Sequence, residues 1–200
     1  GIDFVSGPAA PLIRPNIDTD QIIPSREMKS VGKTGLADGL FAGWRYTAPG
    51  SREPNPDFVM NDPRFAHAPI LLGGANFGCG SSREHAVWAL HEYGVRAVIA
   101  PSFAPIFRGN CVRNGIIPVV LPIEAVEAIA ASGALVAIDL TAQTVTCAER
   151  AYHFEIDPSA KAMLAEGLDS IDLTLKHRDA IAAWQARDRA ERPWVYLEAQ

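Results

Sequence analysis

Short apolar runs and stretches of helical periodicity alternate through the middle of the chain. Three apolar runs bounded by glycine or proline predict buried strands, at 70–72, 95–100 and 116–121. Helices are predicted after these runs, at 82–93, 102–114 and 122–133. Strands that alternate with helices of this length are typical of a parallel sheet.

The last third of the chain changes its pattern twice. Apolar and polar residues alternate along 134–157, which predicts antiparallel strands in a meander. A short helix is predicted at 158–166, and a last helix at 174–189 carries Ile181 and Trp184. Together these elements predict an α/β fold with a mixed sheet, in a single domain over residues 1–200.

The first third of the chain shows no long periodicity. Residues 1–20 are expected to be extended or looped, because Pro8, Pro11 and Pro15 remove backbone donors and break helices. Glycine, proline, asparagine and aspartate crowd the stretch of about 20–68. This stretch is therefore predicted to be a long structured loop with short helical turns, and loops of such length are often functional.

Composition and charge narrow the function classes. The chain has 200 residues with 18 basic and 23 acidic side chains, a net charge of −5 that argues against nucleic-acid binding. No apolar stretch reaches about 18 residues, so no membrane span is expected. The N-terminus lacks the basic and apolar regions of a secretory signal, so we expect a cytoplasmic protein.

The three cysteines are far apart in the sequence, at positions 79, 111 and 147. An odd, sparse count favours reduced thiols over a disulfide framework. No C-x-x-C or H-x-x-x-H spacing is present, so the chain is not expected to bind a metal by itself. Cys79 is expected to pack between glycines, and Cys111 and Cys147 are expected to be core residues.

The densest candidate for chemistry is the loop at 73–85, rich in glycine and serine, between a predicted strand and a predicted helix. Glycines let the backbone approach a ligand closely, and the free N–H groups of a helix N-terminus favour anions. Ser81 and Ser82 add hydroxyl groups, and Arg83 adds a guanidinium suited to a carboxylate. The loop therefore predicts a site for a small anionic substrate.

Structural roles remain open for the same residues. Ser81 and Glu84 have the spacing of a capping box, so Ser81 could be only a helix N-cap. Glu84 and His85 could equally be structural groups of the loop. The Gly32-Lys33-Thr34 triplet resembles the end of a phosphate loop, but Glu27 stands where that motif needs its first glycine.

A second candidate is the run 18–24, in which Asp18 and Asp20 precede an apolar pair. Two carboxylates at this place are consistent with a turn that has an Asx cap. The basic residues Arg26, Lys29 and Lys33 follow. They could form a solvated face or neutralise a second carboxylate of a substrate.

These two motifs also carry a family resemblance. The run 78–85 resembles the active-site loop in the swivel domain of the aconitase superfamily. The run 18–24 resembles the small subunits of the isopropylmalate isomerase branch of that superfamily. Further matching positions span nearly the whole chain, at Thr34-Gly35, 38–41, 99–103, Asn110-Cys111, Asn114-Gly115 and 178–181.

The resemblance implies an aconitase-type swivelling β/β/α domain that works as part of an enzyme. It implies a hydro-lyase reaction that converts 2-isopropylmalate to 3-isopropylmalate through isopropylmaleate, in leucine biosynthesis. It further implies that this chain holds no cofactor, and that a [4Fe–4S] cluster lies in a separate large subunit.

The resemblance also implies residue roles. Ser81 matches the serine that acts as general base, and Asp20 matches a carboxylate close to that serine. Ser82 and Arg83 match residues that contact the substrate. Lys33 stands where many relatives carry an arginine that contacts the substrate, so the charge is kept but the bidentate fork is lost.

Two alternatives remain beside this interpretation. The chain could serve a related hydro-lyase that acts on homoaconitate or on a methylated malate. It could also be a non-catalytic module that binds a carboxylate metabolite and regulates a partner. The combination of Ser81, Arg83 and Asp20 argues against the second alternative, because a simple carboxylate binder needs no general base.

Overall fold

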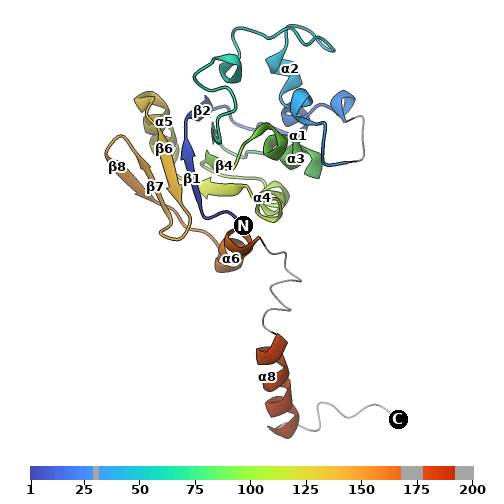
Figure 1. The fold of residues 1–200 in the computed structure, drawn as a ribbon, viewed down its shortest axis with the longest axis vertical. Coiled ribbons are helices and arrows are strands. Elements are labelled where there is room, and N and C mark those ends of the chain that lie inside the picture. Colours follow the sequence, from blue (N-terminus) through green and yellow to red (C-terminus); the bar gives the residue numbers. More distant parts are fainter. Residues whose placement is uncertain (29–31, 168–177, 192–200) are drawn as a thin grey trace. The chain divides into compact units, whose positions relative to one another are not determined.

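Figure 1 shows the computed structural model, which describes residues 1–28, 32–167 and 178–191. The chain divides into two compact units, Gly1–Gly167 and Leu168–Gln200. The first unit carries the sheets, and the second contributes helix α8 (Arg178–Glu191). The first four residues of the last predicted helix, 174–177, lie outside the described residues. The prediction of one domain over 1–200 stays a prediction.

A four-stranded parallel sheet forms the centre of the first unit. Its order is β2-β3-β4-β5, with bounds Ala9–Leu12, Ile70–Gly73, Ala97–Ala100 and Ile117–Val120. Alternate side chains point to opposite faces, and both faces are buried: Leu71 lies in one core cluster and Leu72 in the other. A parallel sheet covered on both faces explains the uninterrupted apolar runs. All three predicted buried strands are confirmed.

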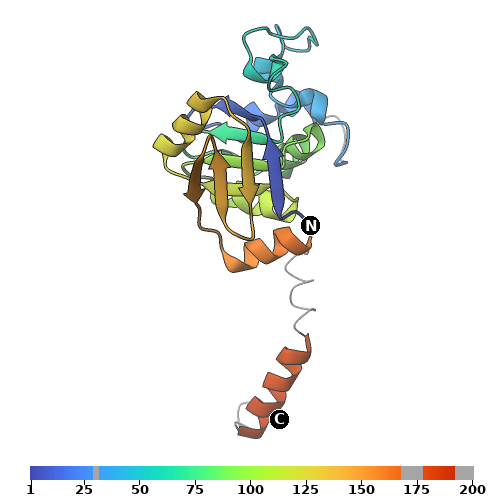
Figure 2. The ribbon, with the colours of Figure 1, turned by 60° about the vertical axis from the view of Figure 1, so that its left-hand side comes forward.

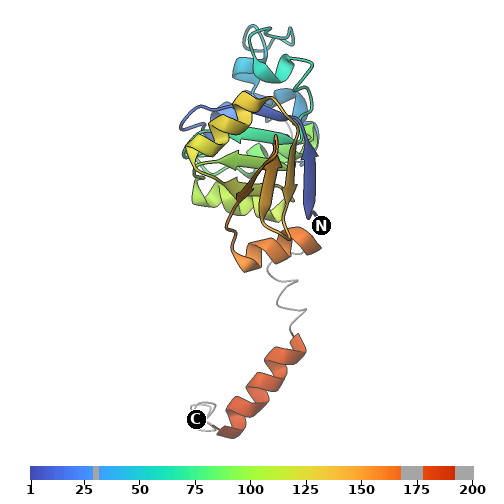
Figure 3. The same cartoon turned by 90° about the vertical axis from the view of Figure 1, so that its left-hand side faces the viewer.

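The antiparallel strands form a second sheet. Its order is β1-β6-β7-β8, with bounds Phe4–Gly7, Val136–Asp139, Thr144–Cys147 and Arg150–His153. The predicted meander is confirmed, but the prediction of one mixed sheet is wrong. The antiparallel sheet lies against the parallel one, with the two sets of strands running across each other (Figures 2 and 3).

The two sheets separate near the start of the chain, at Gly7. This residue has a φ of 153°, and a Cβ there would lie 2.7 Å from Cγ of Pro69. Pro8, which has no N–H, follows it, and the chain passes from β1 in one sheet to β2 in the other. A change of sheet over two residues leaves no periodicity in the sequence, so the pattern alone could not separate the two sheets.

The helices of the first unit contribute to the core clusters on both faces of the parallel sheet. Their bounds are Glu84–Tyr93 for α3, Pro105–Arg113 for α4, Ile123–Ser132 for α5 and Pro158–Glu166 for α6. Leu90 of α3 and Phe107 of α4 belong to the core cluster on one face of the parallel sheet. Val126 of α5 and Leu164 of α6 belong to the cluster between the two sheets. The predicted helices of this unit are thus confirmed, with ends that shift by no more than three residues.

The described part of the long loop, residues 20–28 and 32–68, is structured, as predicted, and contains short helical turns. These are α1 (Thr19–Ile22), η1 (Ser25–Glu27), η2 (Ala37–Gly39), α2 (Ala42–Arg45) and η3 (Val59–Asn61). The buried Phe41 adopts a left-handed φ of 52°, which costs a bulky side chain about 1–2 kcal/mol. Its ring packs 6.0 Å from Trp44 and 5.9 Å from Phe58, and this packing offsets the cost.

Across the described part of the chain, no helix combines the length and the apolar character needed to cross a membrane.

Burial of β3 on both faces gives a direct test of the fold. Leu72 is fully buried, and Leu72→Ala is expected to lower the free energy of unfolding by about 2–5 kcal/mol in urea titrations. The control is Leu135→Ala, because Leu135 is 71% exposed and its loss should cost less than about 0.5 kcal/mol. Equal costs for the two variants would contradict the central place of β3.

Candidate active site at the carboxyl ends of the parallel strands

The serine loop, residues 73–85, follows the carboxyl end of β3, and the N-terminal motif runs beside it. The Gly78 N–H donates to the Ile17 carbonyl at 2.7 Å, and the Thr19 N–H donates to the Cys79 carbonyl at 3.0 Å. The Thr19 hydroxyl, on a buried side chain, donates to the Ser81 carbonyl at 2.6 Å. The two motifs that the sequence singled out, more than fifty residues apart, are therefore hydrogen-bonded neighbours.

The segment after β4 borders the other side of the serine loop. The Phe77 N–H donates to the Ser102 carbonyl at 3.1 Å, and the Ala104 N–H donates to the Phe77 carbonyl at 3.0 Å. The Ser102 hydroxyl accepts from the Asn76 N–H at 2.7 Å. Loops after three adjacent parallel strands thus meet at one edge of the sheet, the edge at which α/β proteins commonly bind ligands.

One glycine of the serine loop meets a strict steric requirement. Gly78 has a φ of 80°, and a Cβ on it would lie 2.1 Å from Cγ of Phe107. No side chain fits at this position, because the loop passes directly over the first turn of α4. Glycine here permits a close approach to another part of the chain, and the expected close approach to a ligand stays a prediction.

The N-terminal motif begins with a helix cap. Asp18 accepts from the Gln21 N–H at 2.7 Å, and the Gln21 side chain accepts from the Asp18 N–H at 3.0 Å. This reciprocal capping box at α1 confirms the predicted Asx cap. It also leaves Asp20 on an exposed turn, next to the serine loop.

Arg83 joins the two motifs through its side chain. Its Nη1 donates to Ser25 Oγ at 2.7 Å and lies 3.3 Å from Asp20 Oδ1. The Arg83 side chain is 27% exposed, and that of Asp20 is 64% exposed. The structure therefore brings Asp20 to the arginine that lies two residues after Ser81. Water screens an exposed pair of this kind, so the contact is weak and easily exchanged.

The structure excludes the capping role that was left open for Ser81. Helix α3 begins at Glu84, and its N-cap is Arg83, with extended backbone at φ −138° and no side-chain cap. Ser81 lies before this extended residue, too early to cap the helix. Its exposed side chain is therefore available for another role, and the N-terminus of α3 has no side-chain cap for its first N–H groups.

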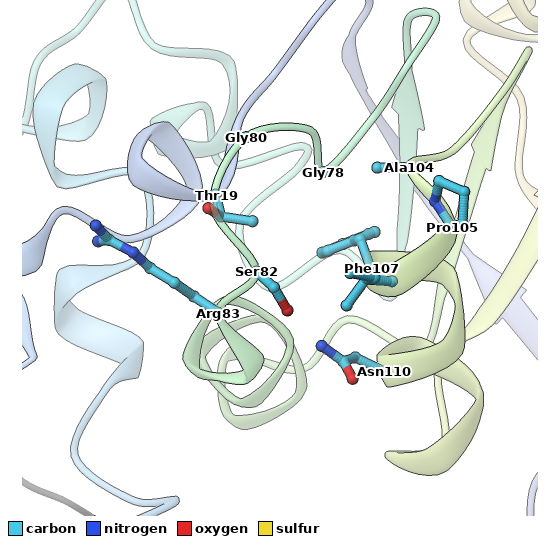
Figure 4. Close-up of a pocket in the computed structure, with 10 residues that line it drawn as sticks. Thr19, Gly78, Gly80, Ser82, Arg83, Ala104, Pro105, Phe107 and Asn110 are labelled. Atoms are coloured by element: carbon cyan, nitrogen blue, oxygen red, sulfur yellow. The ribbon is translucent and has the colours of Figure 1, made fainter.

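A pocket of about 160 Å³ lies beside the serine loop, bounded by α1 and the start of α4. Figure 4 shows the Ser82 side chain extending toward Asn110, while the Arg83 side chain extends to the opposite side. Thr19 and Phe107 line the same pocket. Asn110 is buried, and the Arg113 guanidinium donates to its Oδ1, which fixes the orientation of the amide.

The predicted site residues do not all meet at this pocket. Ser82 and Arg83 line it, whereas Ser81, Asp20 and Lys33 are not among its lining residues. Lys33 is exposed, with Nζ 5.4 Å from the centre of the Trp88 ring.

Several residues next to the pocket have structural roles. Glu84 Oε1 accepts from Asn114 Nδ2 at 3.0 Å, and the His85 ring lies 4.8 Å from the Trp88 ring. Glu84 and His85 therefore have the structural roles that were left open for them above. Cys111 is buried, and burial raises the pKa of its thiol. Cys147 is also buried, so both are core residues as predicted.

Three residues of the site were missed in the sequence. Thr19 lies inside a recognised motif, but nothing marked its hydroxyl as the link to Ser81. Ser25 and Asn110 carried no spacing signal, because their contacts depend on the meeting of separate loops. Of the other basic residues that follow the run 18–24, Arg26 lies with Nε 3.7 Å from Glu27 Oε1, and Lys29 is outside the described residues.

Within residues 1–28, 32–167 and 178–191, no group of three or more histidine, cysteine, aspartate or glutamate side chains is arranged to hold a metal ion.

The two-sheet fold, with a serine loop between a parallel strand and a helix, defines a domain of the aconitase C-terminal class. The family model described as the aconitase C-terminal domain matches residues 3–124. A model described as LeuD_N matches residues 125–158. A third, described as the C-terminal domain of the 3-isopropylmalate dehydratase small subunit, matches residues 170–196.

Individual relatives refine this class. A 3-isopropylmalate dehydratase small subunit from Cupriavidus necator is 55% identical over 199 residues, covering 96% of each chain. A crystal structure of 3-isopropylmalate dehydratase from Methanocaldococcus jannaschii matches with a TM-score of 0.66 and 28% identity, covering 91% of this chain and 99% of the other. The chain belongs to the family of 3-isopropylmalate dehydratase small subunits, which confirms the resemblance recognised in the sequence.

The hydrogen bond from Thr19 to Ser81 can be tested directly. Thr19→Val keeps the shape of the side chain but removes the hydroxyl, so the Ser81 carbonyl loses its donor. The free energy of unfolding is expected to fall by about 1 kcal/mol. Thr19→Ser keeps the hydroxyl and should restore most of that stability in the same denaturant titration. A loss in Thr19→Ser with none in Thr19→Val would mean that packing of the methyl group, not the hydrogen bond, holds the loop.

Proposed function

We propose that this chain, together with a large subunit, forms an enzyme that isomerises 2-isopropylmalate to 3-isopropylmalate in leucine biosynthesis. Water is removed to give isopropylmaleate and is then added back in the other sense. The observation that carries the proposal is the meeting of the serine loop and the run 18–24, where Thr19 binds the Ser81 carbonyl and Arg83 reaches Asp20. Membership of the small-subunit family supports the choice of reaction.

Ser81 is the proposed general base. It takes the proton from the substrate carbon during dehydration and returns a proton to carbon during hydration. A serine hydroxyl is a very weak acid, so its alkoxide needs strong electrostatic support. The uncapped N-terminus of α3 and the nearby Arg83 guanidinium are the sources of positive potential that this chain provides.

Arg83 is the proposed binder of a substrate carboxylate. Its present partners, Asp20 and Ser25, lie on exposed turns, so a carboxylate on the substrate can replace them at small cost. A bidentate contact between a guanidinium and a carboxylate is stronger and better oriented than the single Nη1 contacts seen here. Asp20, released from this contact, is then the carboxylate proposed to lie close to Ser81.

Ser82 and Lys33 are the remaining proposed substrate contacts. Ser82 lines the pocket and contacts the substrate mainly through its backbone N–H. Lys33 provides a positive point charge for a second carboxylate, or contacts the group that distinguishes one hydroxy acid from another.

The proposed site needs a second protein chain to complete it. The relative from Cupriavidus necator is described as a small subunit, and no group of side chains among the described residues of this chain is arranged to hold a metal ion. We infer a large subunit with a [4Fe–4S] cluster that supplies Lewis-acid chemistry at the substrate hydroxyl. The proposed location is the cytoplasm, a compartment in which the three cysteines remain reduced.

Reconstitution tests this proposal. Hydration of isopropylmaleate is measured for this chain alone, for an anaerobically reconstituted large subunit alone, and for the mixture. Activity is expected only in the mixture, because each of the two proteins holds part of the site. No activity in a mixture shown by gel filtration to have assembled would contradict the proposal. Homoaconitate and methylmalate would then test the related hydro-lyases, and their failure would leave the regulatory module.

The role of Ser81 makes a sharper prediction within the active mixture. Ser81→Ala is expected to lower kcat by about 10²–10⁴-fold, the usual contribution of a general base, with little change in KM. Ser82→Ala is the matched comparison, because the neighbouring serine contacts substrate through its backbone. Its effect on kcat should be far smaller, and equal losses in both variants would sink the assignment of Ser81 as the base.

A further inference from the structure

One side of helix α3 carries two residues that hold the segment containing Lys33. Trp88 and Glu92 are four positions apart, so their side chains lie one above the other on the same side of the helix. The segment 33–37, here called the Lys33 segment, contacts both of them. The same helix begins directly after Arg83, the proposed carboxylate binder.

The Glu92 carboxylate binds three consecutive backbone N–H groups of the Lys33 segment. The Gly35 N–H donates to Oε1 at 2.7 Å, and the N–H groups of Leu36 and Ala37 donate to Oε2 at 2.6 Å and 2.9 Å. Gly35 has a left-handed φ of 80°. Successive N–H groups around a left-handed residue form an anion-binding concavity, and here its occupant is a side chain of the protein itself.

The backbone hydrogen bonds to Glu92 favour the charged form of its carboxylate. Burial pushes the pKa of this carboxyl upward, but the backbone donors of Gly35, Leu36 and Ala37 outweigh it and hold the pKa below its ordinary value. Glu92 is therefore ionised at neutral pH, and all three N–H groups keep their acceptor.

Lys33 itself rests on the second residue of this face. Its Nζ lies 5.4 Å from the centre of the Trp88 ring, within the range of a cation–π contact. The Trp88 Nε1 is buried and has no hydrogen-bond partner among the residues described, so this indole contributes its ring face rather than its N–H. The segment is thus attached to α3 by a charged contact and an aromatic contact.

The helix fixes the spacing between the two cations of the site. From Glu84 to Glu92 the rise of an α-helix amounts to about 12 Å. Arg83 lies at one end of this length, Glu92 at the other, and Lys33 contacts Trp88 between them. The position of Lys33 relative to Arg83 therefore depends on how the Lys33 segment is held on α3.

We propose that Glu92 is a positioning residue of the active site: by binding the backbone of the Lys33 segment, it holds the Lys33 ammonium at a set distance from Arg83 to suit a dicarboxylate. The inference rests on the proposed function, because it needs Lys33 to contact the substrate. Glu92 itself touches no substrate and acts through Lys33.

The attachment is measured first on the chain alone. Glu92→Gln keeps the side-chain length but replaces one acceptor oxygen by an NH₂ group that faces backbone donors. Hydrogen exchange at the amides of Gly35, Leu36 and Ala37 is expected to quicken by about tenfold or more. Glu127→Gln, at an exposed site on α5, is the matched control and should leave those amides unchanged. Unchanged exchange in Glu92→Gln would overturn the inference.

The consequence for the reaction is measured in the reconstituted enzyme. Glu92→Gln should raise KM for the dicarboxylate several-fold and leave kcat within about twofold, because the base is untouched. Lys33→Ala should raise KM at least as much. The double variant should be no worse than Lys33→Ala alone, since Glu92 acts through Lys33. Multiplying effects, or a fall in kcat instead of a rise in KM, would overturn the inference and make Glu92 a structural residue.

The two proposals fail in different ways. Inactivity of the assembled wild-type mixture would contradict the proposed function, and the exchange measurement would still decide whether Glu92 holds the segment. An active mixture in which Lys33→Ala leaves KM unchanged would keep the proposed function of Ser81 but overturn the positioning role of Glu92.

Discussion

The site depends on main-chain hydrogen bonding between two segments that are distant in sequence. Residues 16–19 lie alongside residues 75–81, and each segment supplies donors that the other accepts. The buried Thr19 hydroxyl adds a further bond to the Ser81 carbonyl. The exposed Asn76 side chain of the loop donates to Asn16 Oδ1 at 3.0 Å. The other bonds use backbone atoms of the loop, so its path does not depend on the serine side chains. The exposed serines and Arg83 are then presented from a rigid edge.

Much of the fold could be predicted because its signals are local. A parallel strand buried on both faces is a continuous apolar run, and this pattern located β3, β4 and β5. The separation into two sheets could not be predicted, since it depends on Gly7 lying against Pro69 and on which strands find each other. Pairing in space has no counterpart in the periodicity of a single strand.

The candidate site, like the fold, could be predicted from the sequence only in part. The serine loop and the Asp18 cap were visible, because glycines, serines and cap residues act within a few positions. The capping role considered for Ser81 failed because Arg83 adopts extended backbone, which places the serine before the helix. Ser25 and Glu92 carried no signal, because each acts on a segment more than fifty residues away. Such contacts become visible only when the loops are placed in space.

The claim that three loops form one hydrogen-bonded edge is tested most directly by native-state hydrogen exchange at Thr19, Phe77, Gly78 and Ala104. If the three loops form one cooperative unit, these four amides should exchange through the same opening reaction. They should then share one opening free energy, and added denaturant should lower it equally for all four. Separate opening free energies, with Thr19 and Gly78 exchanging through local fluctuations while Phe77 remains protected, would contradict it. The N-terminal motif would then not hold the serine loop.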